Sequence, residues 1–156
     1  MNWEAIGAVG EILGALAVFI SLLYLATQIR ASTNQAKAVM VQNISREFGE
    51  IHNAIMSNPQ LAEVFARISD ADNLTAAEKV QVHSLANRIA LIYVSAATAF
   101  ENHQIPEDYY RSLLQDAQAI EEQYPRIARL IGEIMESHSE MANREIFSRF
   151  RNRGGD

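Results

Sequence analysis

The first thirty residues are apolar over almost their whole length. Between Ile6 and Thr27 the only ionisable side chains are those of Glu11 and Tyr24, and Ser21 is the one hydroxyl residue between those two. A helical segment of this length rises about 33 Å, which is roughly the thickness of a bilayer's hydrocarbon core. A serine hydroxyl can donate a hydrogen bond to a backbone carbonyl of its own helix, so serine is compatible with a membrane-spanning helix. We therefore predict that residues 1–30 form a transmembrane anchor.

The ends of this segment carry the side chains expected at a membrane surface. Trp3 and Tyr24 lie near the two ends, where amphipathic rings favour the headgroup layer, and Arg30 closes the span. A secretory signal peptide is the rival interpretation, but it would begin with positive charge, and the first 29 residues contain no Lys or Arg. Arg30, Lys37 and Arg46 follow the span. The positive-inside rule then places the N-terminus outside and residues 31–156 in the cytosol.

Small residues recur along one side of the predicted span, at spacings of three and four. They are Gly7, Gly10, Gly14, Ala17 and Ser21, and we call them the small-residue stripe. In lipid, helices associate through close backbone contact across small residues, so the stripe predicts a contact with another transmembrane helix. Glu11 borders the stripe and has three interpretations. It reaches the outer headgroups or is protonated, it bonds across the helix contact in a homo-oligomer or with a partner subunit, or it lines a ring that conducts protons or cations.

The same segment carries a family resemblance. The run "WEAIGAVGEILGALAVFISLLYLATQIR" (3–30) resembles the opening of small bacterial single-span membrane proteins of unknown function, with fainter likeness at "NPQLAEVFAR" (58–67) and "FEN" (100–102). The resemblance implies that Glu11 and the glycines belong to a shared pattern. It also implies a bacterial inner (cytoplasmic) membrane as the location. No activity comes with the resemblance.

The rest of the chain has the periodicity of helices throughout. Apolar residues recur every three or four positions over 34–57, and the polar run "RASTNQ" (30–35) is the expected joint with the membrane helix if the two are not continuous. Asn58 with Pro59, "TAAE" (75–78), Pro106 and Pro125 mark four further helix starts. The helix after "TAAE" is the most apolar and is the expected centre of the core. We predict an all-α protein, in which one transmembrane helix precedes a cytosolic bundle of about four or five helices.

Sequence motifs for catalysis, metals or cofactors are missing. The chain has no cysteine, and its four histidines, His52, His83, His103 and His138, lack the Glu-x-x-His or HExxH spacing of a metal site. Glycine-rich phosphate loops and a GxSxG elbow are also absent. We therefore expect no enzyme activity and no cofactor, and we interpret the histidines as surface residues.

Charge adds one local feature. Residues 31–156 carry 12 basic and 17 acidic side chains, which argues against a broad nucleic-acid surface, and no nucleic-acid partner is expected. The tail "REIFSRFRNR" concentrates four arginines, Arg144, Arg149, Arg151 and Arg153. These complement a helix C-terminus, bind an acidic partner, or rest on anionic lipid with the interleaved aromatic rings inserted.

These features favour a non-enzymatic, membrane-anchored accessory or scaffold protein. Its expected partners are membrane lipid and another transmembrane helix, supplied by itself or by a larger complex. Two alternatives stay open at this point. One is a tethered sensor with a small-molecule pocket around Tyr93 and Phe100, and the other is an ion-conducting oligomer that uses Glu11.

Overall fold

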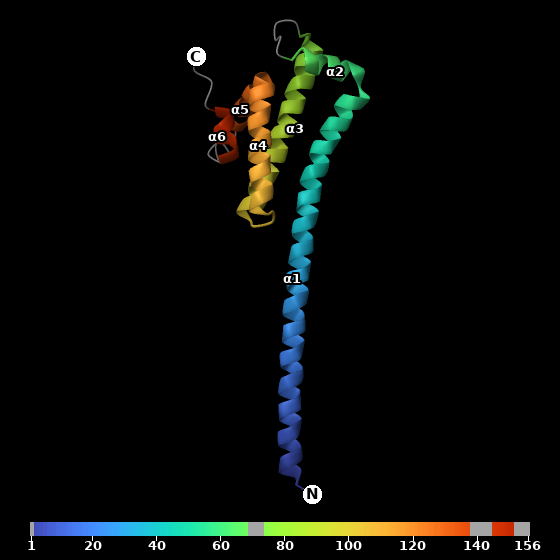
Figure 1. Ribbon diagram of the computed structural model, residues 1–156, viewed down its shortest axis with the longest axis vertical. Helices are drawn as coiled ribbons and strands as arrows, with labels where there is room; N and C mark the ends of the chain where they lie inside the picture. The colour runs from blue at the N-terminus through green and yellow to red at the C-terminus, as the bar shows by residue number, and fades with distance from the viewer. Residues whose placement is uncertain (1, 69–73, 138–144, 152–156) are drawn as a thin grey trace. The chain divides into compact units, whose positions relative to one another are not determined.

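The computed structural model describes residues 2–68, 74–137 and 145–151, and almost all of them are helical (Figure 1). The helices are α1 (Trp3–Ser57), α2 (Pro59–Ala66), α3 (Ala76–Glu101), α4 (Glu107–Gln123), α5 (Pro125–Glu136) and α6 (Glu145–Arg151). No strand occurs among the described residues. The predicted all-α class is therefore confirmed, together with a long apolar helix at the N-terminus.

The chain divides into two compact units, Met1–Ala38 and Val39–Asp156, and α1 contributes residues to both. The helix α1 passes through residues 30–35 without a break, so the two segments are continuous and no joint forms at this polar run. This polar run contains neither Gly nor Pro. The hydroxyl of Thr33 donates to the carbonyl of Ile29 at 2.9 Å and thereby stays within the helix. The polar side chains of this run therefore make the helix surface hydrophilic without ending the helix.

Capping side chains start two helices of the second unit as predicted. The Asn58 side chain accepts hydrogen bonds from the backbone N–H groups of Gln60 and Leu61, at 3.1 and 3.2 Å. Thr75 and Glu78 form a complete capping box, in which each side chain accepts from the other's backbone N–H. The carboxylate of Glu78 also bonds the Arg67 guanidinium at 2.6 Å. Backbone and side-chain hydrogen bonds from Thr75, followed by the Arg67 charge, lower the pKa of Glu78 below its ordinary value.

Helix α3 lies at the centre of the core of the second unit. Figure 1 shows it between the Val39–Ser57 part of α1 and the group formed by α4, α5 and α6. Its buried residues are Val82, Ala86, Ile89, Ala90, Ile92, Tyr93, Ala96, Ala97 and Ala99. The Tyr93 ring meets Phe48 edge-on at 5.6 Å and Phe150 at 5.8 Å between ring centres. Rings from α1, α3 and α6 thus join three distant segments of the chain.

The closest backbone approach at a described glycine is between α5 and α6. A Cβ atom added to the buried Gly132 would lie 3.0 Å from the backbone carbonyl oxygen of Phe150. A methyl group at this distance forces one helix to move, because a backbone atom cannot rotate away as a flexible side chain can. Glycine at position 132 therefore lets α6 lie directly on α5.

Candidate functional site

The small-residue stripe lies on a face of α1 that no other part of the described chain covers. Every residue of the stripe is exposed, and so is Glu11. A Cβ atom built on Gly7, Gly10 or Gly14 would meet no atom within 4 Å. The Ser21 hydroxyl donates to the carbonyl of Ala17 at 2.8 Å, so its polar group is satisfied within the helix as expected. The stripe is therefore open for a partner's backbone to approach.

The segment around the stripe is long and apolar enough to cross a membrane, and none of its most apolar stretch is buried within the protein. Its large apolar side chains are each at least half exposed, which is an unfavourable arrangement in water. Trp3 and Tyr24 are the most exposed aromatic residues of the segment, at 72% and 69%, and Arg30 is exposed as well. Within the described chain, packing therefore does not remove the apolar surface of this segment from water.

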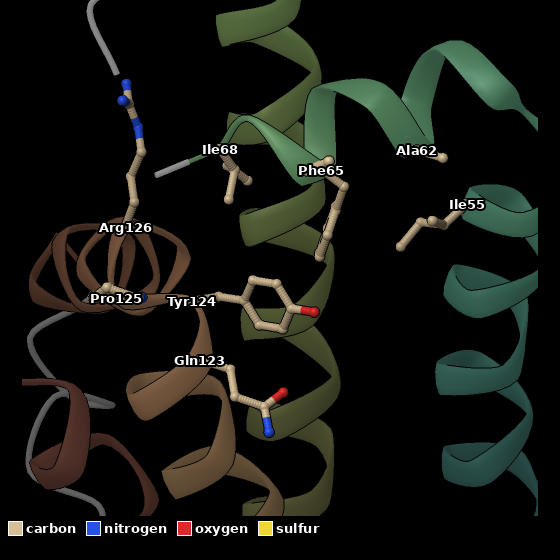
Figure 2. A pocket seen from close by; sticks show the side chains of 9 residues that line it. Ile55, Ala62, Phe65, Ile68, Gln123, Tyr124, Pro125 and Arg126 are labelled. Atoms are coloured by element: carbon tan, nitrogen blue, oxygen red, sulfur yellow. The ribbon is translucent and has the colours of Figure 1, made fainter. Parts of the chain in front are cut away.

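A cavity of about 330 Å³ lies between α2 and the junction of α4 with α5 (Figure 2). Its lining is mainly apolar and comprises Ile55, Ala62, Phe65, Ala66, Ile68, Gln123, Tyr124, Pro125 and Arg126. The rings of Phe65 and Tyr124 meet edge-on, with centres 5.0 Å apart. Figure 2 shows the Arg126 guanidinium directed away from these rings, and its Nη1 atom is buried without a hydrogen-bond partner among the described residues. The cavity can hold a small apolar or aromatic group, but its described lining offers no nucleophile paired with a base.

A second cavity, of about 340 Å³, lies between α3 and the second-unit part of α1. It is lined by Met40, Asn43, Ile44, Glu47, Arg88, Leu91, Ile92 and Ser95. At its edge Arg88 forms ion pairs with Glu47, at 3.1 Å, and with Glu50. The hydrogen bonds that Arg88 donates to the carboxylates of Glu50 and Glu47 raise its pKa above the ordinary value. Arg88 therefore stays charged and ties α3 to α1, which sequence spacing alone could not show.

The pocket expected around Tyr93 and Phe100 is not among these cavities. Tyr93 is fully buried between Phe48 and Phe150, and the ring of Phe100 stacks on Tyr110 with centres 4.2 Å apart. Both rings thus fill core space instead of lining an opening. The Tyr93 hydroxyl is also buried, and it has no hydrogen-bond partner in the described part of the chain. Burial, followed by the charge of Asp116, raises the pKa of Tyr93 well above its ordinary value.

Three of the four histidines, His52, His83 and His103, are exposed, and His138 lies outside the described residues. Within residues 2–68, 74–137 and 145–151, no group of three His, Cys, Asp or Glu side chains is placed to hold a metal ion. The described part of the chain therefore brings no metal-binding set together.

The structure contradicts one of the roles expected for the basic tail. Arg144 and Arg153 lie outside the described residues, as do the side chains of Arg149 and Arg151. The role expected of the four arginines therefore stays a prediction. The apolar residues between them, Ile146, Phe147 and Phe150, are buried against the bundle at 0%, 2% and 8% exposure. The hypothesis that these aromatic rings insert into lipid is therefore wrong, because they complete the protein core.

Comparison with protein-family models, with curated proteins and with solved structures finds no match to this chain.

Proposed function

We propose that this chain is a non-enzymatic, single-span protein of the bacterial inner membrane that acts as an accessory or scaffold subunit. The first unit crosses the bilayer with its N-terminus outside, and the helical bundle of the second unit lies in the cytosol. The stripe of α1 docks against another transmembrane helix, from a second copy or from a larger membrane complex. Trp3 and Tyr24 hold the span at the two surfaces, and Glu11 bonds across the helix contact.

One observation carries this proposal: the three glycines of the stripe present bare backbone that nothing in the described chain covers. Glycine inside a helix costs about 1 kcal/mol relative to alanine. Three such positions on one face of an otherwise strongly apolar helix are therefore expensive unless a neighbour uses the space they leave. A second helix whose backbone approaches closely gains van der Waals contact there and offsets that cost.

The test has two parts, both on the full chain in native membranes. Extraction with alkaline carbonate must leave the protein in the membrane pellet, because a helix in lipid resists it. Replacing Gly10 and Gly14 together by Ile must then abolish the assembly seen by cross-linking, since two branched side chains hold the backbones apart.

The matched control is the double replacement of Ala8 and Ala15 by Ile. At about 100° per residue these two positions point well away from the stripe while adding similar apolar bulk. We expect the control to assemble as the unmodified protein does. Release into the supernatant would refute the membrane location, and unchanged assembly of the glycine variant would refute the stripe as the contact.

A further inference from the structure

The heptad spacing of the stripe does not end with Ser21. Continuing at steps of three and four, the same side of α1 carries Tyr24, Gln28, Ala31, Gln35 and Ala38. All five belong to the first unit, to the same uninterrupted helix as the stripe, and all are exposed. Beyond the membrane-surface residue Tyr24, the seam therefore alternates between glutamine and alanine. We call Gln28, Ala31, Gln35 and Ala38 the juxtamembrane seam.

A repeat of 3.5 residues is the spacing that keeps two helices in contact as a left-handed coiled coil. Apolar residues usually drive such a contact in water, and this seam has only two alanines. The seam is therefore too weak to associate alone, and another part of the chain must bring the two helices together. The membrane contact is the obvious source. Once two spans are held together, the segments that follow them are at high effective concentration, and a weak seam suffices.

The chemistry of the seam indicates what the partner is. A glutamine side chain offers two N–H donors and a carbonyl acceptor, so it pairs with an identical side chain at the same level. Gln28 and Gln35 are seven residues apart, so two parallel copies in register bring each glutamine opposite itself. Ala31 and Ala38 leave room for the two backbones to approach. The cations Arg30 and Lys37 project from a different side of the helix, so a parallel pair does not set like charges face to face.

Membrane topology favours the same partner. A second copy inserts in the same direction and to the same depth, so it supplies parallel orientation and matching register without further cost. We propose that residues 28–38 form a parallel, in-register contact with the same residues of a second copy of this chain. This inference rests on the proposed membrane function and refines it, because it selects self-association over a different partner subunit.

The absence of cysteine makes the proposal directly testable. Single cysteines are introduced at Ala31 and at Ala38 in the full chain, and membranes are treated with a mild oxidant. A disulfide requires Cα atoms about 4.4–6.8 Å apart, so it reports close approach. We expect disulfide-linked dimers at both seam positions. The matched controls, Ala36→Cys and Thr33→Cys, lie on other sides of the helix. They are expected to form much less disulfide-linked dimer than the seam variants.

Two further arms identify the partner and the role of the amides. Copies bearing two different tags must be recovered in one disulfide-linked species, whereas a link to another protein would overturn the choice of partner. In the Ala38→Cys background, Gln35→Glu sets two carboxylates opposite each other and must remove most of the dimer. Equal cross-linking at seam and control positions, or an unaffected Gln35→Glu variant, would overturn the seam.

Failure of this inference is distinguishable from failure of the proposed function. If Gly10 and Gly14 prove necessary for assembly while Ala31→Cys and Ala38→Cys form no dimers, the membrane contact stands and the juxtamembrane seam is wrong. If seam dimers form but persist when both glycines are replaced by Ile, the seam stands and the two copies are held together by a contact other than the stripe. If replacing both glycines leaves assembly unchanged and no seam cysteine forms dimers, both are refuted.

Discussion

The buried hydroxyl of Tyr93 allows a sharp test of the packing in the second unit. Its side chain is fully buried, and its hydroxyl has no hydrogen-bond partner in the described part of the chain. A buried polar group left unpaired costs about 1–3 kcal/mol of stability. The change Tyr93→Phe removes that group and keeps the ring in place against Phe48 and Phe150. We therefore expect stabilisation by about 1–2 kcal/mol, which for a unit of this size raises Tm by roughly 3–8 °C.

The matched control is Tyr109→Phe. The Tyr109 hydroxyl lies 2.9 Å from the Ser45 hydroxyl and donates more weakly to the Val41 carbonyl at 3.4 Å. Loss of an ordinary hydrogen bond costs about 0.5–1.5 kcal/mol, so this variant must be destabilised. The same atom is deleted in both proteins, and the predicted signs are opposite. Thermal unfolding of the full chain in detergent, followed by circular dichroism, measures both changes. Equal destabilisation of the two variants would refute the reasoning, because it would mean that the Tyr93 hydroxyl has a bonding partner.

Alkaline pH gives an independent check on the same residue. Burial raises the pKa of Tyr93 in the folded protein, so the unfolded chain ionises first, at about pH 10. Above that pH the folded state binds the extra proton, and stability falls as pH rises. Tyr93→Phe removes this contribution, so the stability gap between variant and unmodified protein must widen above about pH 10. A constant gap would contradict the proposed burial.

Two further predictions concern α5 and the start of α3. Gly132→Ala sets a methyl group against the backbone of α6, so the α5–α6 contact must shift and loosen, and we expect faster proteolysis at the C-terminal end. The control Gly49→Ala meets no atom within 4 Å and should gain up to about 1 kcal/mol of stability. Since hydrogen bonding lowers the pKa of Glu78, its contribution to stability is present above its unfolded pKa and is lost as pH falls through the folded value. Glu78→Gln keeps a capping side chain that cannot titrate, so its denaturation midpoint must depend less steeply on pH below about 4.5, and an unchanged slope would count against the capping box as the cause.

Local signals in the sequence predicted most helix boundaries of the second unit. The starts of α2 and α3 follow from side chains that bond within three residues of themselves, and α5 begins at a proline. Interactions between distant segments were not predictable in this way. Arg88 bonds two glutamates of α1 that lie 38 and 41 residues away, and no spacing rule connects them.

The pair of tyrosines at the start of α4 shows why burial is harder to predict than helicity. Adjacent residues on a helix point about 100° apart, so the sequence pattern allows either ring to face the core. In the structure Tyr110 is buried and stacks on Phe100, while Tyr109 is half-buried and bonds Ser45. Which tyrosine faces inward depends on where α1 and α3 lie, and that depends on the whole bundle.

The first unit presents the opposite situation. Its helix needs no tertiary contact within the chain, so composition and length alone were sufficient to predict it, and the described structure leaves its surface uncovered. Under the proposed function, lipid and another transmembrane helix cover this surface. The side chains that recur every seven residues then become the best guide to the partner, because a second copy repeats them at the same depth and in the same order. A partner of different sequence would need a closely approaching backbone opposite the glycines of the stripe and amide side chains opposite the glutamines of the seam. The proposed self-association therefore needs no second sequence that carries a matching pattern.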